Sequence, residues 1–179
     1  MAITATDILF KLSVTTGPGN STAQADVNLS LGEFISTTQI TDATLNNLYD
    51  DVSGDENAAS DVEYRCIFVH NAHATLTWQS VVCWLSAEVA GGANAAISID
   101  STAASALASA TAQALEVANE STAPAALTFS APTTKATGLA IGNLVAGNVR
   151  AIWVRRTATN SAALNNDGVT VRCEGDTAA

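Results

Sequence analysis

Two β-branched runs, separated by glycine and asparagine, occupy the last third of the chain. They cover residues 149–157 and 169–174, and the turn Asn166-Asp167-Gly168 precedes the second run. Such side chains suit a pleated sheet, and Asn or Asp before Gly suits turns that need a positive φ. The pattern therefore predicts paired strands at the C-terminal end. It lacks the polar groupings that are typical of a catalytic site.

Alternating apolar residues predict further strands in the first two thirds of the chain. Residues 8–14 and 27–31 predict an N-terminal hairpin with a long, polar, mobile tip. Additional short strands are expected at residues 93–100, 114–117 and 127–130.

A second hairpin is expected at the centre of the fold. Residues 62–70 carry apolar side chains on both faces towards their end, which is typical of a central strand covered on both sides. Residues 75–89 are expected to be the partner strand. Trp78 and Trp84 lie an even number of positions apart in it, so they are expected to share a face.

Helix is expected only in short turns. One such turn is predicted at residues 40–48, capped by Asp42, with Leu45, Leu48 and Tyr49 on its buried side. Residues 101–112 are predicted to form an irregular or briefly helical crossing, because their alanines are interspersed with Ser and Thr.

These elements predict an all-β fold, an antiparallel β-sandwich or jelly roll with short helical turns. About eight or nine short strands with turn signals between them are typical of that class. The expected organisation is a single β-sandwich domain over residues 1–179, with an N-terminal hairpin arm, residues 1–36, that could extend to a neighbouring subunit. Trp153 is predicted to lie in the core between the two sheets, and an anchor in an interface is the alternative.

The composition excludes several classes of partner. Seventeen acidic residues against seven basic ones give a net charge of −10, so direct binding to nucleic acid is not expected. No run approaches the ~18 apolar residues of a membrane span. The N-terminus lacks the basic and apolar regions of a signal peptide, which predicts a soluble protein made in a cytosol. Few lysines and many small neutral residues are common in proteins that work outside cells or in large assemblies.

The residues that could bind a metal or act as nucleophiles do not form a recognisable site. Cys66 and His70 would lie roughly 13 Å apart on one strand, too far to share a zinc ion with His73. The acidic stretch 50–61 departs from the calcium-loop pattern, so a solvated loop is favoured over a calcium site. No nucleophile motif is present. Neither a cofactor nor a metal is expected, and the chain is not expected to be an enzyme.

The three cysteines, Cys66, Cys83 and Cys173, form no C-x-x-C pair. Small buried apolar residues are the favoured interpretation. A disulfide between subunits of an extracellular particle is the alternative.

Charge is distributed unevenly along the chain. Four of the seven basic residues lie in the final strands, while seven acids fall between Asp42 and Glu63. A solvated face would explain this asymmetry, and so would complementary patches that meet on a neighbouring subunit. The candidate interface residues are Arg150, Arg155, Arg156, Arg172, Asp50, Asp51, Asp55 and Glu56.

Four stretches of the chain, residues 2–8, 63–75, 151–157 and 167–176, resemble small structural proteins of tailed bacteriophages and prophages. The resemblance implies a virion component without enzymatic activity, and several capsid decoration (cement) proteins of this size are β-sandwiches or jelly rolls. The resemblance spans most of the chain, but it consists of strand sequences that carry no chemistry.

The expected function is therefore that of a virion structural protein, most of all a capsid decoration or cement protein that stabilises the head by binding across capsomers. Its expected partners are the major capsid protein or other virion proteins, and a homo-oligomer is expected. It would be made in the host bacterial cytoplasm and located in the virion. A tail, collar or baseplate component is the alternative. A carbohydrate-binding module, which would expose Trp78 or Trp84 for stacking on sugar, is an alternative of another class.

Overall fold

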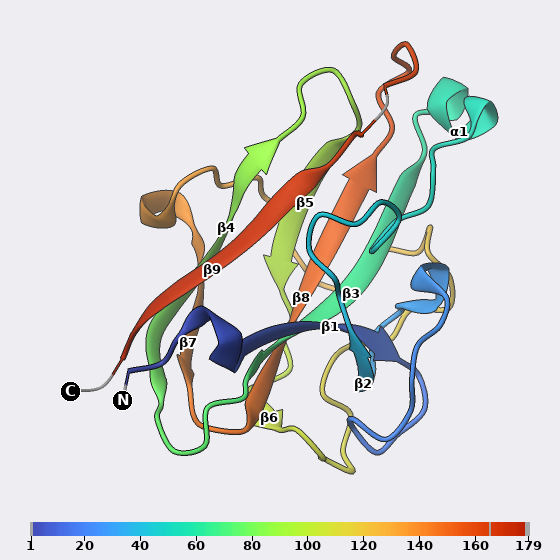
Figure 1. The fold of residues 1–179 in the computed structure, drawn as a ribbon. Coiled ribbons are helices and arrows are strands. Elements are labelled where there is room, and N and C mark those ends of the chain that lie inside the picture. Colours follow the sequence, from blue (N-terminus) through green and yellow to red (C-terminus); the bar gives the residue numbers. More distant parts are fainter. Residues whose placement is uncertain (1, 165, 178–179) are drawn as a thin grey trace.

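The computed structural model describes residues 2–164 and 166–177, and it confirms an all-β fold of antiparallel sheets in a sandwich-like arrangement (Figure 1). The larger sheet has the order β2-β1-β3-β8-β5, with β6 also paired to β8, and the smaller sheet has the order β7-β4-β9. The elements are β1 (Ile8–Val14), β2 (Phe34–Gln39), α1 (Gly54–Ala59), β3 (Val62–Asn71), β4 (Trp78–Glu88), β5 (Asn94–Ile99), β6 (Ser105–Ala106), β7 (Leu139–Leu144), β8 (Asn148–Thr157) and β9 (Val169–Thr177).

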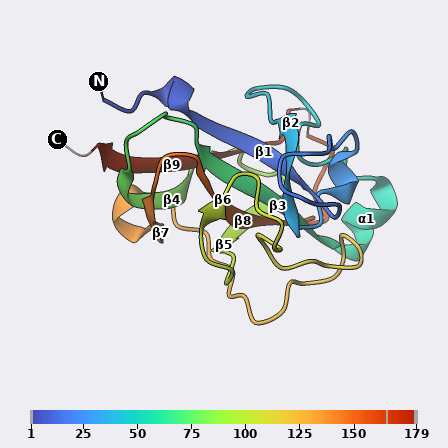
Figure 2. The same ribbon diagram turned by 90° about the horizontal axis from the view of Figure 1, so that it is seen from below.

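Two separate apolar cores lie on the two faces of the larger sheet. Alternation along β3 and β8 directs Ile67, Val69, Ile152 and Val154 towards the smaller sheet, where they meet residues of β4 and β7. Ile97 of the neighbouring strand β5 joins the same core. The other face of the same strands carries the second core, which contains Cys66, Phe68, Ala151 and Trp153 together with Leu31, Ala114 and Val117 from irregular segments. The chain between β5 and β7, yellow to gold in Figure 2, supplies part of this cover.

Trp153 therefore lies in a core, but not in the one between the two sheets. Its side chain is fully buried in the second core, on the face of the larger sheet that irregular segments cover. The prediction was wrong in placing it between the sheets, because Ile152 and Val154, its neighbours on β8, face the smaller sheet instead.

Strands form at residues 8–14, 62–71, 78–88, 94–99, 148–157 and 169–177, but the predicted central hairpin and the predicted C-terminal strand pair are each split between the two sheets. β3 pairs with β1 and β8, whereas β4 pairs with β7 and β9; likewise, β8 pairs with β3, β5 and β6, and β9 pairs with β4. At the end of β3, the amide of Asn71 donates to the carbonyls of Leu76 and Leu144. His73 Nδ1 accepts from the backbone N–H groups of Thr75 and Leu76. These bonds fix the corner at which the chain leaves one sheet for the other.

Trp78 and Trp84 lie on opposite faces of β4, contrary to the prediction. The register of β4 shifts between Trp78 and Val81, and Ser80 has a positive φ of 51°. Such a bulge inserts one residue and reverses the alternation. Trp78 consequently joins Val81 in the inner core, and Trp84 points away from it. Both rings remain buried, with exposed fractions of 5% and 6%.

The N-terminal segment, residues 1–36, is integrated into the larger sheet as far as it is described. β1 lies between β2 and β3, and its hairpin partner is β2. Residues 27–31 do not form that partner, because Val27–Leu29 is a 3₁₀ helix capped by Asp26. The loop predicted to be mobile packs on the body through bonds from Gly19 N to Ser109 O at 2.9 Å and from Asn20 N to Ile35 O at 2.7 Å.

The helix of the structure lies beside the predicted position. Residues 41–49 form turns, with positive φ at Ala43 and Asn46, and Leu45 is 68% exposed rather than buried. α1 instead occupies the stretch predicted to be a solvated acidic loop. Ser53 and Glu56 explain this, because each side chain accepts the backbone N–H of the other in a capping box.

Residues 101–112 are mostly irregular, as predicted, but the strands predicted at residues 114–117 and 127–130 do not form. Of residues 101–112, only β6 is regular, and no helix is present there. Residues 114–117 run beside residues 31–33, with a bond from Val117 N to Leu31 O at 3.0 Å, but they form only an isolated bridge. Ser130 likewise forms a single bridge to Ile97 at the edge of β5.

Candidate functional site

Among the described residues, the largest group of charged side chains linked by ion pairs is a buried cluster across β3 and β8. Glu63 and Arg156 are directly opposite each other in the register of these strands, and Arg156 Nε donates to Glu63 Oε2 at 2.6 Å. Arg65, which is fully buried, lies 3.6 Å from the same carboxylate through Nη2. The same Nη2 donates to Glu120 Oε2 at 2.5 Å and to Asn28 Oδ1 at 2.6 Å. The cluster therefore ties two loops to the sheet.

Tyr49 completes this cluster from the loop that precedes α1. The guanidinium carbon of Arg65 lies 5.0 Å from the ring centroid, and that of Arg156 lies 4.6 Å away, so the ring contacts two cations. The phenol donates to Val154 O at 2.6 Å, and burial raises the pKa of Tyr49 far above its ordinary value. Tyr49 is thus uncharged, and its hydrogen bond holds the loop before α1 against β8.

Two of the predicted interface residues meet inside the chain. Arg156 Nη2 lies 3.2 Å from Asp50 Oδ1, and Arg156 Nη1 donates to the carbonyl of Asp50. Asn28 Nδ2 donates to the other oxygen of the Asp50 carboxylate at 3.1 Å. The acidic and arginine-rich segments do attract each other, but for this pair the contact is intramolecular. That Asp50 and Arg156 also contact another subunit stays a prediction.

Several other predicted interface residues are also occupied within the chain. Half-buried Arg150 donates through Nη2 to Asp100 O at 2.8 Å and through Nη1 to Thr102 O. The guanidinium of Arg155 lies 5.6 Å from the ring of Phe129. Glu56 caps α1. Each of these side chains holds an irregular segment or a helix end in place.

Three predicted residues remain exposed, namely Arg172, Asp51 and Asp55. The side chain of Arg172 is 59% exposed and lies over Trp84, with its guanidinium carbon 5.5 Å from the ring centroid. Asp51 precedes α1, and Asp55 lies in the first turn of that helix. These three are the members of the predicted set whose side chains a partner could reach at the surface.

Cys66, His70 and His73, which were considered as metal ligands, each have their own surroundings in the structure. Cys66 and His70 are buried on β3, and burial lowers the pKa of His70, with Lys11 adding to the effect. His73 Nδ1 is taken by two backbone donors. Within residues 2–164 and 166–177, no group of three or more His, Cys, Asp or Glu side chains could hold a metal ion.

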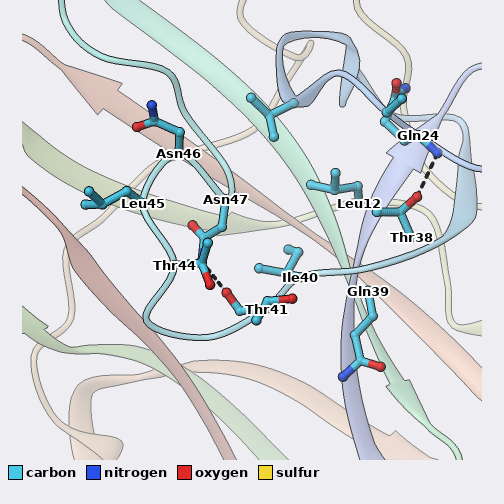
Figure 3. A pocket seen from close by; sticks show the side chains of 12 residues that line it. Leu12, Gln24, Thr38, Gln39, Ile40, Thr41, Thr44, Leu45, Asn46 and Asn47 are labelled. Atoms are coloured by element: carbon cyan, nitrogen blue, oxygen red, sulfur yellow. Dashed lines mark hydrogen bonds between the residues drawn. The ribbon is translucent and has the colours of Figure 1, made fainter.

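Two hollows on the surface of the described residues are lined without a group of side chains arranged for catalysis. One, of about 220 Å³, is lined by the end of β2, residues 24–27 and residues 40–47; Figure 3 shows its Thr, Asn and Gln side chains around Leu12, Ile40 and Leu45. None of its lining side chains titrates. The other, of about 500 Å³, contains Asp7 and His73. Thr4 N–H and Oγ1–H bind the Asp7 carboxylate and lower its pKa.

Comparison with known proteins gives no relative for this chain: no family model, no curated protein and no solved structure matches it. Among the helices of the described residues, none has the length and apolar character needed to cross a membrane.

Sequence reasoning found Arg156 and Asp50 as charged residues of interest but missed the buried members of the cluster. Glu63 and Arg65 fall within the predicted strand at residues 62–70, and Tyr49 lies on the buried side of the turn predicted at residues 40–48. The available signal was the placement of Glu63 and Arg65 on one face of a strand that is otherwise apolar, because charged residues are seldom fully buried unless they are paired.

Proposed function

We propose that this chain is a structural protein of a tailed-bacteriophage virion, and that it acts as a capsid decoration or cement subunit that binds across capsomers. The observation that carries the proposal is the use of the buried charges. Glu63, Arg65 and Arg156 bind one another and the surrounding loops. The charged side chains that could have acted in catalysis instead hold the loops against the sheet. Such a use suits a protein with a mechanical role.

The sequence resemblance set out above supports the same class of function. The surface adds to it, since few lysines and many small neutral side chains suit extensive contact with a protein shell. A stable interface needs about 1,200–2,000 Å² of total buried area. Repetition of a modest contact over a symmetric shell would convert it into firm attachment through avidity. The partners are the major capsid protein or other virion proteins, including further copies of this chain.

The alternative as a carbohydrate-binding module receives less support. Such a site needs aromatic rings that are open to solvent, but Trp78, Trp84 and Trp153 have exposed fractions of 5%, 6% and 0%. The stacking surfaces proposed for sugar are therefore covered by protein.

The decisive experiment locates the protein in purified particles. Mass spectrometry of virions should detect it, and electron microscopy of intact particles should place it on the head. Density in the tail, collar or baseplate would replace the decoration role by the alternative structural role. Absence of the protein from purified particles would overturn the virion proposal. Particles that lack the gene product should assemble but break more readily on heating or osmotic shock.

A binding assay on stripped particles tests the exposed residues. The variant Arg172→Gln should rebind less tightly than the wild type, and its binding should depend less on salt. Lys135→Gln is the matched control, because Lys135 is also exposed and also contacts Glu174 but lies outside the predicted interface. Equal losses for the two variants would argue against a specific role for Arg172.

A further inference from the structure

Two of the three cysteines are directly opposite each other in the smaller sheet. Cys83 of β4 and Cys173 of β9 are partners in the antiparallel register of these strands, although ninety positions separate them along the chain. Residues opposed in this way have Cα atoms ~4.5 or ~5.5 Å apart, depending on the type of pair. A disulfide needs a Cα separation of about 4.4–6.8 Å. The strand register therefore allows the bond without a rearrangement of the backbone.

Both thiols lie on the same side of their sheet. Cys83 is fully buried in the core between the two sheets, and Cys173 packs against that core from β9. Both are free in this structure. Cys66 is also free, but it lies in the second core on the far face of the larger sheet. The layer of β3 and β8 separates it from the other two.

β9 is the element that such a bond would hold. It is the last strand of the chain and an edge strand, and β4 is its only strand partner within the described residues. Figure 1 shows it, in red, as a long strand that ends near the N-terminal segment. A covalent link to β4 would prevent this edge strand from detaching.

We propose that Cys83 and Cys173 are a modification site, which is oxidised to an intramolecular disulfide when the protein moves from a reducing cytosol to an oxidising medium. The site does not depend on the virion role proposed above. It differs from the predicted disulfide between subunits, because both sulfur atoms belong to one chain. The bond would close a loop that contains β5 to β8 and would join the two ends of that loop across the smaller sheet.

The oxidant can be a low-molecular-weight disulfide such as oxidised glutathione. The thiolate of Cys173, the more exposed of the pair, attacks one sulfur of the oxidant and releases one glutathione thiolate. The Cys83 thiolate then attacks Cys173 Sγ in the mixed disulfide and releases the second glutathione. The two cysteines lose two electrons, the oxidant gains them, and the two thiol protons pass to the released glutathione. Burial raises the pKa of the Cys173 thiol, so the reaction should be slow at neutral pH and faster in alkali.

The test uses the whole chain, purified under reducing conditions and then equilibrated with oxidised glutathione at mildly alkaline pH. Thiol titration after denaturation should fall from three free thiols to one, and peptide mapping should find Cys83 linked to Cys173 and Cys66 free. The thermal midpoint of the oxidised protein should exceed that of the reduced protein by roughly 5–15 °C. Refolding of the unfolded chain in a glutathione redox buffer should give the same link. In the unfolded chain both thiols are accessible to the oxidant, so burial does not slow the reaction.

Variants separate this pair from the third cysteine. Cys66→Ala should keep both the link and the oxidation-dependent shift of the midpoint, whereas Cys173→Ser should lose both. If Cys83→Ala fails to fold, Cys173→Ser still tests the proposal, because Cys173 is only partly buried. Persistence of three free thiols after refolding in the redox buffer would overturn it. Linkage through Cys66, or a covalent dimer in place of the internal bond, would overturn it as well.

Discussion

Trp153 Nε1 donates a hydrogen bond of 2.7 Å to Asp100 Oδ2 beneath the irregular segments that cover the larger sheet. The carboxylate is almost fully buried, and it also accepts Leu115 N–H at 2.9 Å and Thr102 N–H at 2.7 Å. One side chain at the end of β5 thus joins the indole of β8 to the start and the end of the loop between residues 101 and 118. This bond organises a core that has no second sheet to cover it.

Replacement of Asp100 by alanine should destabilise the protein by about 2–5 kcal/mol, because it leaves the indole N–H and two backbone N–H groups without acceptors. Urea unfolding of the wild type and the variant measures the difference. Asp42→Ala is the matched control, since Asp42 is exposed and accepts from the N–H of the adjacent residue, Ala43. A loss at Asp100 no larger than that at Asp42 would contradict the role assigned to this carboxylate.

Truncation of Trp153 to alanine should cost about 3–5 kcal/mol in unfolding free energy, because a fully buried indole leaves a large cavity. Trp153→Phe should retain more of the stability, since it keeps an aromatic ring and loses mainly the bond to Asp100. Unfolding of both variants by urea tests the order. Unchanged stability in Trp153→Ala, combined with loss of assembly, would instead make Trp153 an interface anchor.

The strands were predictable because the alternation that marks them is local. Residues 62–70 and 149–157 carry the signal in their own side chains, and they form β3 and β8. The pairing of strands was not predictable in the same way. It depends on short features such as the acceptor bonds of His73 at a sheet corner and the positive φ of Ser80 in a bulge. Neither residue type specifies such a conformation by itself.

The charged residues show the same division. The sequence identifies Asp50 and Arg156 as members of opposite clusters but does not reveal that they belong together, because 106 positions separate them along the chain. Their contact arises only when β3 and β8 pair and the loop carrying Tyr49 closes over them. Complementary charge in one sequence can therefore serve internal contacts as readily as contacts between subunits.

Substitution of Gly32 by alanine should destabilise the fold by about 2–4 kcal/mol. Gly32 has a φ of 102°, and an added Cβ would collide with the carbonyl of Leu115, which accepts a bond from Glu33 N. Gly54→Ala is the control, because a Cβ at the start of α1 meets no atom within 4 Å. Thermal unfolding should show a large fall for the first variant and little change for the second. Equal thermal midpoints for the two variants would show that the segment around Leu115 makes room for the added Cβ without loss of stability.

The pH dependence of stability should reveal the buried carboxylate of Glu63. Burial raises its pKa above the ordinary value of 4.5, against the opposing effect of Arg156 and Arg65. The folded protein therefore binds a proton at Glu63 more readily than the unfolded chain does. This favourable contribution is complete below the unfolded-chain pKa, and it is lost as pH rises through the higher folded-state pKa.

The measurement is urea unfolding of the wild type and Glu63→Gln from pH 7 down to about pH 4, which brackets the ordinary pKa. The wild type should gain stability relative to the variant as pH falls. Glu174→Gln gives a control of opposite sign, because the bond from Lys135 lowers the pKa of Glu174 and its contribution is lost on acidification. If the wild type instead lost stability relative to Glu63→Gln at low pH, the two arginines would outweigh burial at this site. The cluster would then hold Glu63 as an anion that acid releases.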